Sequence, residues 1–240
     1  MTDGIDTNAA IWKSDAVIKE WAAKASERER ARIGHWQTMA KLLPFGESDE
    51  FTFVDLGAGM GAAARTVLDY YPRSTAVLAE FSPQMISEGT RELAPYGGRF
   101  RYVEFDMLAG AWPDAIQTDL DAVITSLCIH HMPDDRKQGL FVEIFEHLVP
   151  GGWYFNYAPV TSSDPLVEGT WQHTSDRDDP EAEHKRTHRT AQEQARYENH
   201  VRYMIPLDQQ LGYFRAAGFE GIDIYWKHLE NVIYGGRRPS

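Results

Sequence analysis

The chain has 240 residues, of which 42% are hydrophobic and 25% are charged. These fractions lie near globular averages and exclude a chain that is disordered throughout. The 36 acidic and 24 basic residues give a net charge of −12, which argues against a nucleic-acid surface along the whole chain. The length suits one domain with a helical elaboration, or at most two small domains.

The cysteine count and the N-terminus limit the cellular context. Cys128 is the single cysteine, which excludes an intrachain disulfide and a multi-cysteine zinc site. The first ten residues have neither the basic region nor the apolar region of a secretory signal. No uncharged apolar run approaches the roughly 18 residues of a membrane helix. We therefore expect a protein of the reducing cytoplasm, without a membrane partner.

The chain begins with a predicted helical segment and continues as alternating strands and helices. Apolar residues recur every three or four positions over 8–43, until Pro44 and Gly46 break the pattern. Helical stretches then separate short apolar runs, and Ser82-Pro83 has the residues of a helix start. This alternation predicts a doubly wound α/β fold with a mostly parallel sheet. The predicted strands are 51–56, 74–80, 99–105, 119–129 and 153–158.

The C-terminal third departs from that alternation. Residues 160–205 are polar, with few aliphatic side chains, and we interpret them as a helical insertion that either serves as a lid over a substrate pocket or has a purely structural role. Pro206 opens another predicted helix, and 219–234 alternates apolar and polar residues as an antiparallel hairpin does. The expected organisation is an N-terminal helical segment (1–45) followed by one ligand-binding domain (46–240).

A glycine-rich turn at the end of the first strand is the strongest functional signal. Gly57, Gly59 and Gly61 lie where a strand passes into a helix, so the backbone can turn sharply and approach a ligand. Glu80 ends the second strand, where a carboxylate accepts hydrogen bonds from a ribose diol. The third strand ends at Asp106, which could accept from an adenine amino group or cap a turn.

Further residues at these strand ends complete the predicted cofactor site. Met85 and Met107 are polarisable and could flank a flat ring. Asp55 lies two residues before the first glycine, where it suits a cationic amine and would repel a pyrophosphate. A cofactor with an amino-acid tail and no phosphate therefore fits better than NAD, although a dehydrogenase stays an alternative. The remaining expected cofactor-binding residues are Ala58, Phe81 and Ser126.

Together these motifs resemble the class I S-adenosylmethionine (SAM) dependent methyltransferases. The resemblance covers about 51–158 and 217–237, and it includes the Pro-Gly-Gly turn that leads into the fifth strand. It implies a seven-stranded Rossmann-like sheet completed by the C-terminal hairpin, with SAM as the cofactor and S-adenosylhomocysteine as its product. It also implies that Asp55 and the glycine backbone lie near the methionine part of SAM.

Methyl transfer is an in-line displacement, and a hydroxyl nucleophile needs a base. His130 follows the fourth strand and resembles in position the catalytic histidine of plant-type O-methyltransferases. Tyr157 is the second catalytic candidate. Arg32, or its neighbours Arg28 and Arg30, could reach the cofactor carboxylate. The candidate substrate contacts are His131, Asn156, Trp171 and Tyr197.

No metal site is expected. His184 and His188 have the i, i+4 spacing of a helical chelate, but Lys185, Arg186 and Arg189 surround them and oppose a divalent cation.

The expected function is methyl transfer from SAM to an oxygen or nitrogen of a small molecule. A relative that resembles carboxy-SAM synthase, or a tRNA-modifying enzyme that uses SAM, is the alternative within enzymes. A non-catalytic SAM-binding protein is the alternative outside them. The one dense basic cluster, 185–189, does not favour a nucleic-acid substrate. The sequence leaves the acceptor and the oligomeric state open, including a homodimer.

Overall fold

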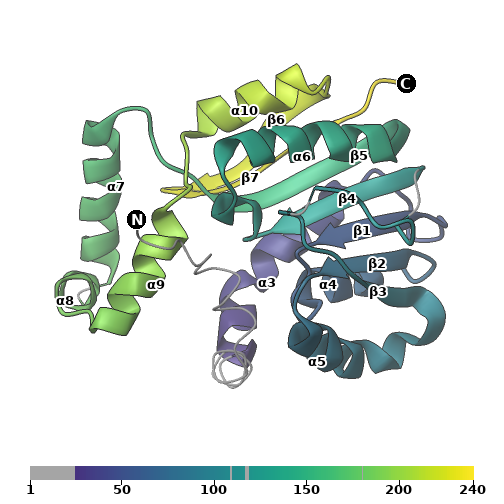
Figure 1. Ribbon diagram of the computed structural model, residues 1–240, viewed down its shortest axis with the longest axis horizontal. Coiled ribbons are helices and arrows are strands. Elements are labelled where there is room, and N and C mark those ends of the chain that lie inside the picture. Colours follow the sequence, from purple (N-terminus) through teal and green to yellow (C-terminus); the bar gives the residue numbers. More distant parts are fainter. Residues whose placement is uncertain (1–24, 109, 117–118, 180) are drawn as a thin grey trace.

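The computed structural model describes residues 25–108, 110–116, 119–179 and 181–240. A seven-stranded sheet forms its centre, with the order β3-β2-β1-β4-β5-β7-β6 (Figure 1). The first five strands in this order are parallel, whereas β7 runs antiparallel to both β5 and β6. This confirms the predicted fold and its C-terminal hairpin. The strands are β1 (Thr52–Leu56), β2 (Thr75–Glu80), β3 (Phe100–Glu104), β4 (Leu120–Ser126), β5 (Leu148–Pro159), β6 (Glu220–His228) and β7 (Asn231–Arg237).

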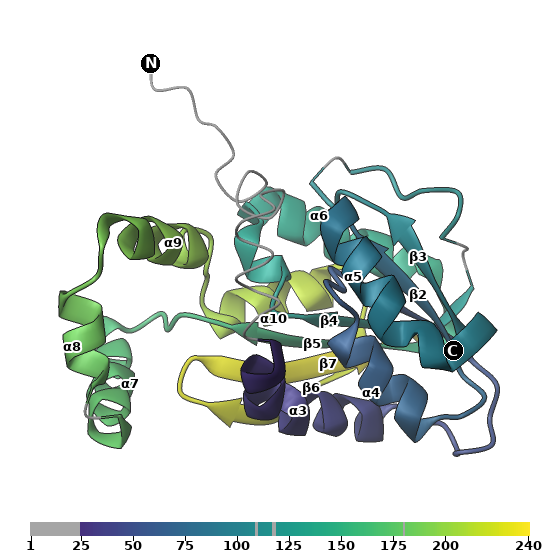
Figure 2. The same ribbon diagram turned by 90° about the horizontal axis from the view of Figure 1, so that it is seen from below.

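Helices cover both faces of the sheet, as Figures 1 and 2 show from two directions. On one face, apolar side chains of α3 (Ala25–Leu42) and α4 (Ala62–Tyr70) pack on the sheet, together with the end of α5 (Pro83–Leu93). On the other face, α6 (Asp134–His147) and α10 (Leu207–Ala216) form a second core. Short 3-10 turns, η1 (Ala94–Arg99) and η2 (Ile129–His131), follow α5 and β4. None of the helices in the described part of the chain is long and apolar enough to cross a lipid bilayer.

The ends of these elements follow local chemistry. The Ser82 hydroxyl caps α5 by accepting from the Met85 amide, and Pro83 occupies the first turn, as predicted. The predicted N-terminal helix is seen as α3, and its residues before 25 lie outside the described residues. The fifth strand is longer than predicted, because β5 begins at Leu148, directly after α6. Gly151, with φ of 84°, lets the chain bulge there while the strand keeps its pairing with β4.

The predicted helical insertion is three helices that stand beyond the carboxyl ends of the parallel strands (Figure 1). Its two ends meet at a short parallel bridge, where the Thr161 amide donates to the Ile205 carbonyl over 3.0 Å. The buried Lys137 ammonium of α6 adds a hydrogen bond to the Tyr203 carbonyl. Both ends of the insertion are therefore anchored to the main domain. The helices are α7 (Pro165–Asp178), α8 (Ala182–Thr187) and α9 (Ala191–Val201).

Candidate functional site

The turn between β1 and α4 places backbone without side chains at the edge of the sheet. The Gly57 amide donates to the Ala79 carbonyl over 2.8 Å, which holds the turn against β2. Gly57 has φ of +71°, and a Cβ there would lie 2.6 Å from the Cβ of Cys128. Gly59 has φ of +54°, and nothing lies within 4 Å of its Cβ position. Only glycine fits at Gly57, whereas Gly59 leaves open space for a ligand.

Asp55 carries a buried carboxylate with one oxygen in use. Its Oδ2 accepts from the Ala64 amide over 3.1 Å, and within the described residues no donor reaches its buried Oδ1. Burial raises the pKa of Asp55 from 3.8 to about 7, and the Glu80 charge adds to this, while the Ala64 amide opposes it. A buried acceptor without a partner is costly, so this oxygen is suited to a donor supplied by a ligand.

Glu80, at the end of β2, is held by backbone amides. Its Oε1 accepts from Phe81 (3.0 Å) and Ser82 (2.9 Å), and its Oε2 accepts from Gly59 (2.9 Å). Burial raises the pKa of Glu80, and these three hydrogen bonds oppose that rise. A carboxylate has about four lone-pair positions, so one on Oε2 stays open for a ligand hydroxyl.

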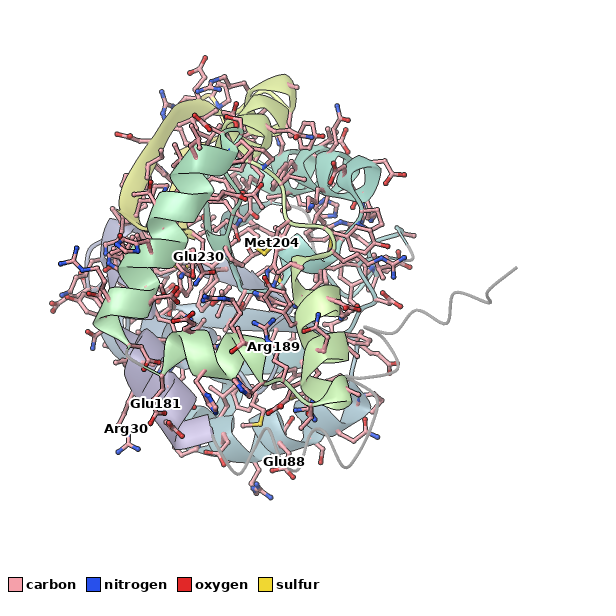
Figure 3. The ribbon with its side chains drawn as sticks, turned by 90° about the vertical axis from the view of Figure 1, so that its left-hand side faces the viewer. Arg30, Glu88, Glu181, Arg189, Met204 and Glu230 are labelled. Atoms are coloured by element: carbon pink, nitrogen blue, oxygen red, sulfur yellow. The ribbon has the colours of Figure 1, made fainter. Side chains whose placement is uncertain are left out.

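A single cavity of about 1010 Å³ joins these strand ends to the insertion. Seen from that side in Figure 3, α7, α8 and α9 lie in front, and the lining residues Met204 and Glu230 lie behind them. The volume is at the upper end for small-molecule sites, so a cofactor and an acceptor both fit. The predicted cofactor-binding residues in its lining are Arg32, Asp55, Gly57, Ala58, Gly59, Glu80, Phe81, Met85, Asp106, Met107 and Ser126.

Asp106 combines the two roles considered from the sequence. It lines the cavity, and its Oδ1 caps the following turn by accepting from the Leu108 amide over 3.0 Å. Among the neighbouring arginines, Arg32 lines the cavity and Arg30 is exposed. The side chain of Arg28 is outside the described residues.

Two of the predicted site residues lie elsewhere. Gly61 packs against the core, since a Cβ there would lie 2.5 Å from the Leu93 side chain. Asn156 is fully buried, and its amide bonds Thr125 (2.7 Å) and Tyr234 (2.8 Å). Neither residue lines the cavity. The predicted substrate contact through the Asn156 side chain is therefore not supported.

The remaining predicted site residues line the far side of the cavity. His130, 2% exposed, and His131 come from η2, and Tyr157 stacks on His35 with ring centroids 4.6 Å apart. From the insertion come Trp171 and Tyr197, which are covered by the cations of Lys227 (4.0 Å) and Arg189 (3.6 Å) respectively. The strand ends and the insertion thus provide two differently composed halves of one cavity.

Two contributors to this site were missed from the sequence. His200 of α9 reaches η2, where its Nδ1 lies 3.2 Å from the Nε2 of His130. Trp36 of α3 donates from its indole nitrogen to the Ser126 hydroxyl over 2.8 Å, and both residues line the cavity. The sequence carries no local signal that pairs these residues, because 70 and 90 positions separate them.

Comparison with known proteins finds one family model that matches part of the chain. Residues 53–152 match the family model described as a methyltransferase domain. No curated protein matches the chain.

Solved structures share the fold at low sequence identity. Human N-acetylserotonin methyltransferase in complex with SAM is 15% identical, with a TM-score of 0.66, over 100% of this chain and 61% of that one. An O-methyltransferase family protein from Burkholderia thailandensis is 17% identical, with a TM-score of 0.62, over 95% of this chain and 64% of that one. The YcgJ protein from Bacillus subtilis is 13% identical, with a TM-score of 0.62, over 86% of this chain and 99% of that one.

The chain therefore spans less than two thirds of the first two of these proteins. The family match covers β1 to the start of β5, which includes the glycine turn, Asp55 and Glu80. Over residues 53–152 the chain is therefore similar to the methyltransferase-domain family, and its sheet has the fold of solved methyltransferases.

Proposed function

We propose that this protein binds SAM and transfers its methyl group to an oxygen or nitrogen of a small molecule. The observation that carries the proposal is the buried Oδ1 of Asp55, which lines the cavity without a protein donor among the described residues. The cationic amine of SAM would supply that donor, and its charge would favour the ionised carboxylate. The open lone pair on Glu80 would accept from the ribose.

The glycine turn supports the same ligand. The open space over Gly59 would leave room for the methionine tail of the cofactor, and the side chains of Met85 and Met107 line the same cavity. The acidic side chains Asp55 and Glu80 make this half of the cavity unsuited to a pyrophosphate. These features favour SAM over a dinucleotide.

In the proposed reaction, SAM supplies an electrophilic methyl group on its sulfonium, and the chain supplies positioning. The histidine and tyrosine side of the cavity holds the acceptor, so that its nucleophilic atom can approach the methyl in line. Burial lowers the pKa of His130 well below its usual value, and the neighbouring His131, His200, Lys137 and Arg32 add to this. His130 is therefore neutral and can accept a hydrogen bond from the acceptor, but its lowered pKa makes it a weak base; Tyr157 lines the same wall.

The lining also supports a small acceptor. The insertion closes over the strand ends, and it supplies Trp171 and Tyr197 as aromatic surfaces. A flat, partly apolar molecule fits such a lining.

Calorimetric titration with S-adenosylhomocysteine tests the cofactor half of the proposal. The wild-type protein should bind it, and Asp55→Ala should bind about 10–100-fold more weakly, because a charge-assisted hydrogen bond is lost. Asp49→Ala is the matched control, because Asp49 is an exposed loop carboxylate that accepts from the Gly46 amide and does not line the cavity. Equal binding by wild type and Asp55→Ala would remove the assigned role of Asp55, and no binding by wild type would overturn the proposed cofactor.

A further inference from the structure

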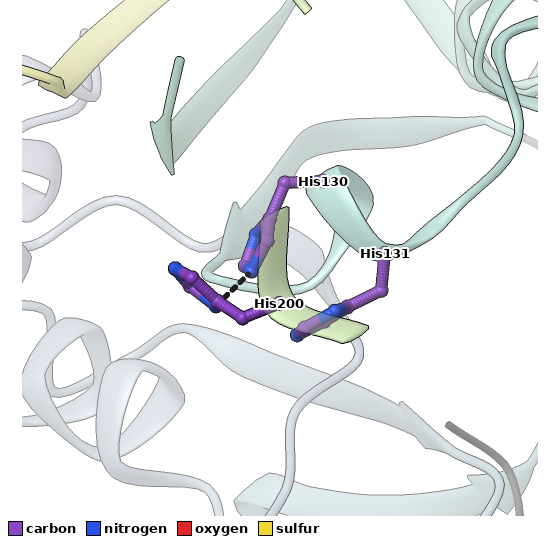
Figure 4. Close-up of side chains that lie close together, drawn as sticks. All are labelled: His130, His131 and His200. Carbon is purple, nitrogen blue, oxygen red and sulfur yellow. Dashed lines mark hydrogen bonds between the residues drawn. The ribbon is translucent and has the colours of Figure 1, made fainter. Parts of the chain in front are cut away.

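Three histidines meet at one point of the cavity wall. His130 and His131 belong to η2, and His200 belongs to α9 of the insertion. Each offers a ring nitrogen, and these three nitrogens all lie within 4.8 Å of one another (Figure 4). The closest pair, Nε2 of His130 and Nδ1 of His200, is separated by 3.2 Å. The insertion therefore brings together a potential set of three nitrogen ligands.

The cluster has ring nitrogens that the protein does not satisfy. The Nδ1 atoms of His130 and His131 are both buried, and within the described ranges neither has a hydrogen-bond partner. His130 itself is 2% exposed. Buried histidines in a packed core normally have partners for both nitrogens. Since the Nε2 of His130 faces His200, the His130 Nδ1 points away from the cluster, and the Nδ1 of His131 is the buried atom open to a group from outside the chain.

Charges around the cluster are of both signs. Arg32 and Lys137 contribute positive charge, and Glu230 contributes negative charge beside His200. The Lys137 charge is offset by Asp134, whose carboxylate lies 3.1 Å from the ammonium. This differs from His184 and His188, which Arg186 and Arg189 flank in the sequence and which join no cluster of three metal-binding side chains among the described residues.

The separation of the ring nitrogens fits their binding to a single tetrahedral metal ion. Two nitrogens on a tetrahedral ion with bonds of about 2.0–2.1 Å lie about 3.3 Å apart, which is close to the His130–His200 separation. The most distant nitrogen needs to move by about 1.5 Å, which side-chain rotation provides. Imidazole ligands favour Zn²⁺, Ni²⁺, Cu²⁺ and Fe²⁺ over Mg²⁺ and Ca²⁺, and three protein ligands leave a coordination position open.

We propose that His130, His131 and His200 bind one divalent transition-metal ion whose open position takes the anionic oxygen of the methyl acceptor. This inference rests on the proposed function, and it assigns the acceptor a hydroxyl group. The metal would lower the pKa of that hydroxyl, and its proton would leave to solvent. The oxygen–carbon bond then forms as the carbon–sulfur bond breaks, and the sulfonium becomes a neutral thioether. In this arrangement the metal replaces His130 as the group that activates the acceptor.

The test is metal binding by the full-length chain after treatment with a chelator. Titration with Co²⁺, followed by its visible absorption, should give one ion per chain with the bands of a four-coordinate nitrogen site. Because His200 is exposed on α9, His200→Ala should fold normally. It should bind Co²⁺ at least about tenfold more weakly. His131→Ala should do the same.

A matched control is available in the insertion itself. His184 and His188 stack with ring centroids 4.0 Å apart, and both are exposed. The double variant His184→Ala/His188→Ala should bind Co²⁺ like wild type. No Co²⁺ binding by wild type, or loss of binding only in this control variant, would overturn the metal site. Titration of His200→Ala with S-adenosylhomocysteine separates the two proposals. Normal binding of S-adenosylhomocysteine by this variant would support the cofactor assignment, whatever the result of the Co²⁺ titration.

Discussion

The protonation of Asp55 links its buried position to the stability of the fold. Its pKa of about 7 in the folded chain exceeds the usual 3.8, so the folded state holds a proton that the unfolded state releases. The contribution of Asp55 to stability is therefore lost as pH rises from about 4 to about 7, and Asp55→Asn lacks this loss. We expect Asp55→Asn to be more stable than wild type at pH 8, by at most roughly 4 kcal/mol, with a much smaller difference near pH 4.

Urea denaturation of both proteins at pH 4.5 and pH 8 measures this. The cofactor amine would reverse the effect, because it stabilises the ionised form of Asp55. Addition of S-adenosylhomocysteine at pH 8 should therefore raise the stability of wild type more than that of Asp55→Asn. A constant difference between the two proteins across pH would contradict the assigned protonation.

Gly57 and Gly59 have the same sign of φ and different surroundings, so they form a matched pair. Gly57→Ala should destabilise the fold by about 2–4 kcal/mol, because its Cβ meets Cys128 in a left-handed conformation. Gly59→Ala should cost only about 1 kcal/mol and should still weaken S-adenosylhomocysteine binding, because its methyl group enters the open space. Denaturation and calorimetry of the two variants measure both quantities. Equal stability losses, or unchanged binding by Gly59→Ala, would refute this division.

Asn156 and Tyr157 illustrate what residue-level prediction from the sequence misses. Both end the fifth strand, but adjacent strand residues point to opposite faces of a sheet. Tyr157 reaches the cavity, and Asn156 joins the hydrogen bonds of Thr125 and Tyr234 on the other face. Asp55 and Glu80, by contrast, were predictable because the strand-to-helix turn constrains them locally.

At the scale of elements, α9 depends on its cap. Thr190 and Glu193 form a reciprocal capping box at its start, and this helix carries His200 to the cavity. Thr190→Ala should destabilise α9 by about 1 kcal/mol. We expect the KM of the acceptor to rise about fivefold, with unchanged S-adenosylhomocysteine affinity.

Steady-state kinetics and calorimetry provide the two readouts. Glu193→Gln is the control, since glutamine also completes a capping box. A fall in S-adenosylhomocysteine affinity in Thr190→Ala would show that α9 supports the cofactor half of the cavity as well.

The boundaries of the helices and strands show where sequence patterns are sufficient to predict the structure. The Ser82-Pro83 start of α5 was predicted correctly, because both residues act within one helical turn. The start of β5 was placed too late, because Pro150-Gly151-Gly152 has turn residues although the chain there continues to pair with β4 across a bulge. The pairing of His200 with His130 depends on how the insertion folds back, and helical periodicity does not encode that.

At the scale of the whole molecule, the insertion is a separable unit. Thr161 and Pro206 form a bridge at its base, so its ends lie side by side. Replacing 163–204 by a short Gly-Ser linker should preserve a single unfolding transition and S-adenosylhomocysteine binding. Methyl transfer should fall by at least about 100-fold, because the acceptor loses its positioning surface. Loss of folding on deletion would contradict the separability of the insertion.

The overall architecture was predictable from the sequence because its strand and helix patterns agree with one another along the chain. The alternation of apolar runs and amphipathic stretches predicted the parallel strands, and the terminal hairpin followed from its alternating residues. The position of the insertion, and its possible role as a lid over the substrate pocket, were considered from the sequence, but the contacts that hold it across the strand ends were not. That placement comes from contacts between residues far apart in the chain, such as Lys137 with Tyr203.

The sulfur beneath the glycine turn has a chemical consequence. Burial raises the pKa of the Cys128 thiol, with Asp55 and Glu80 adding to the rise, and the thiol donates to the Leu56 carbonyl. Alkylating agents and peroxides attack the anionic form, which is scarce here. We therefore expect the Cys128 thiol to resist oxidation and alkylation under conditions that modify exposed thiols of low pKa.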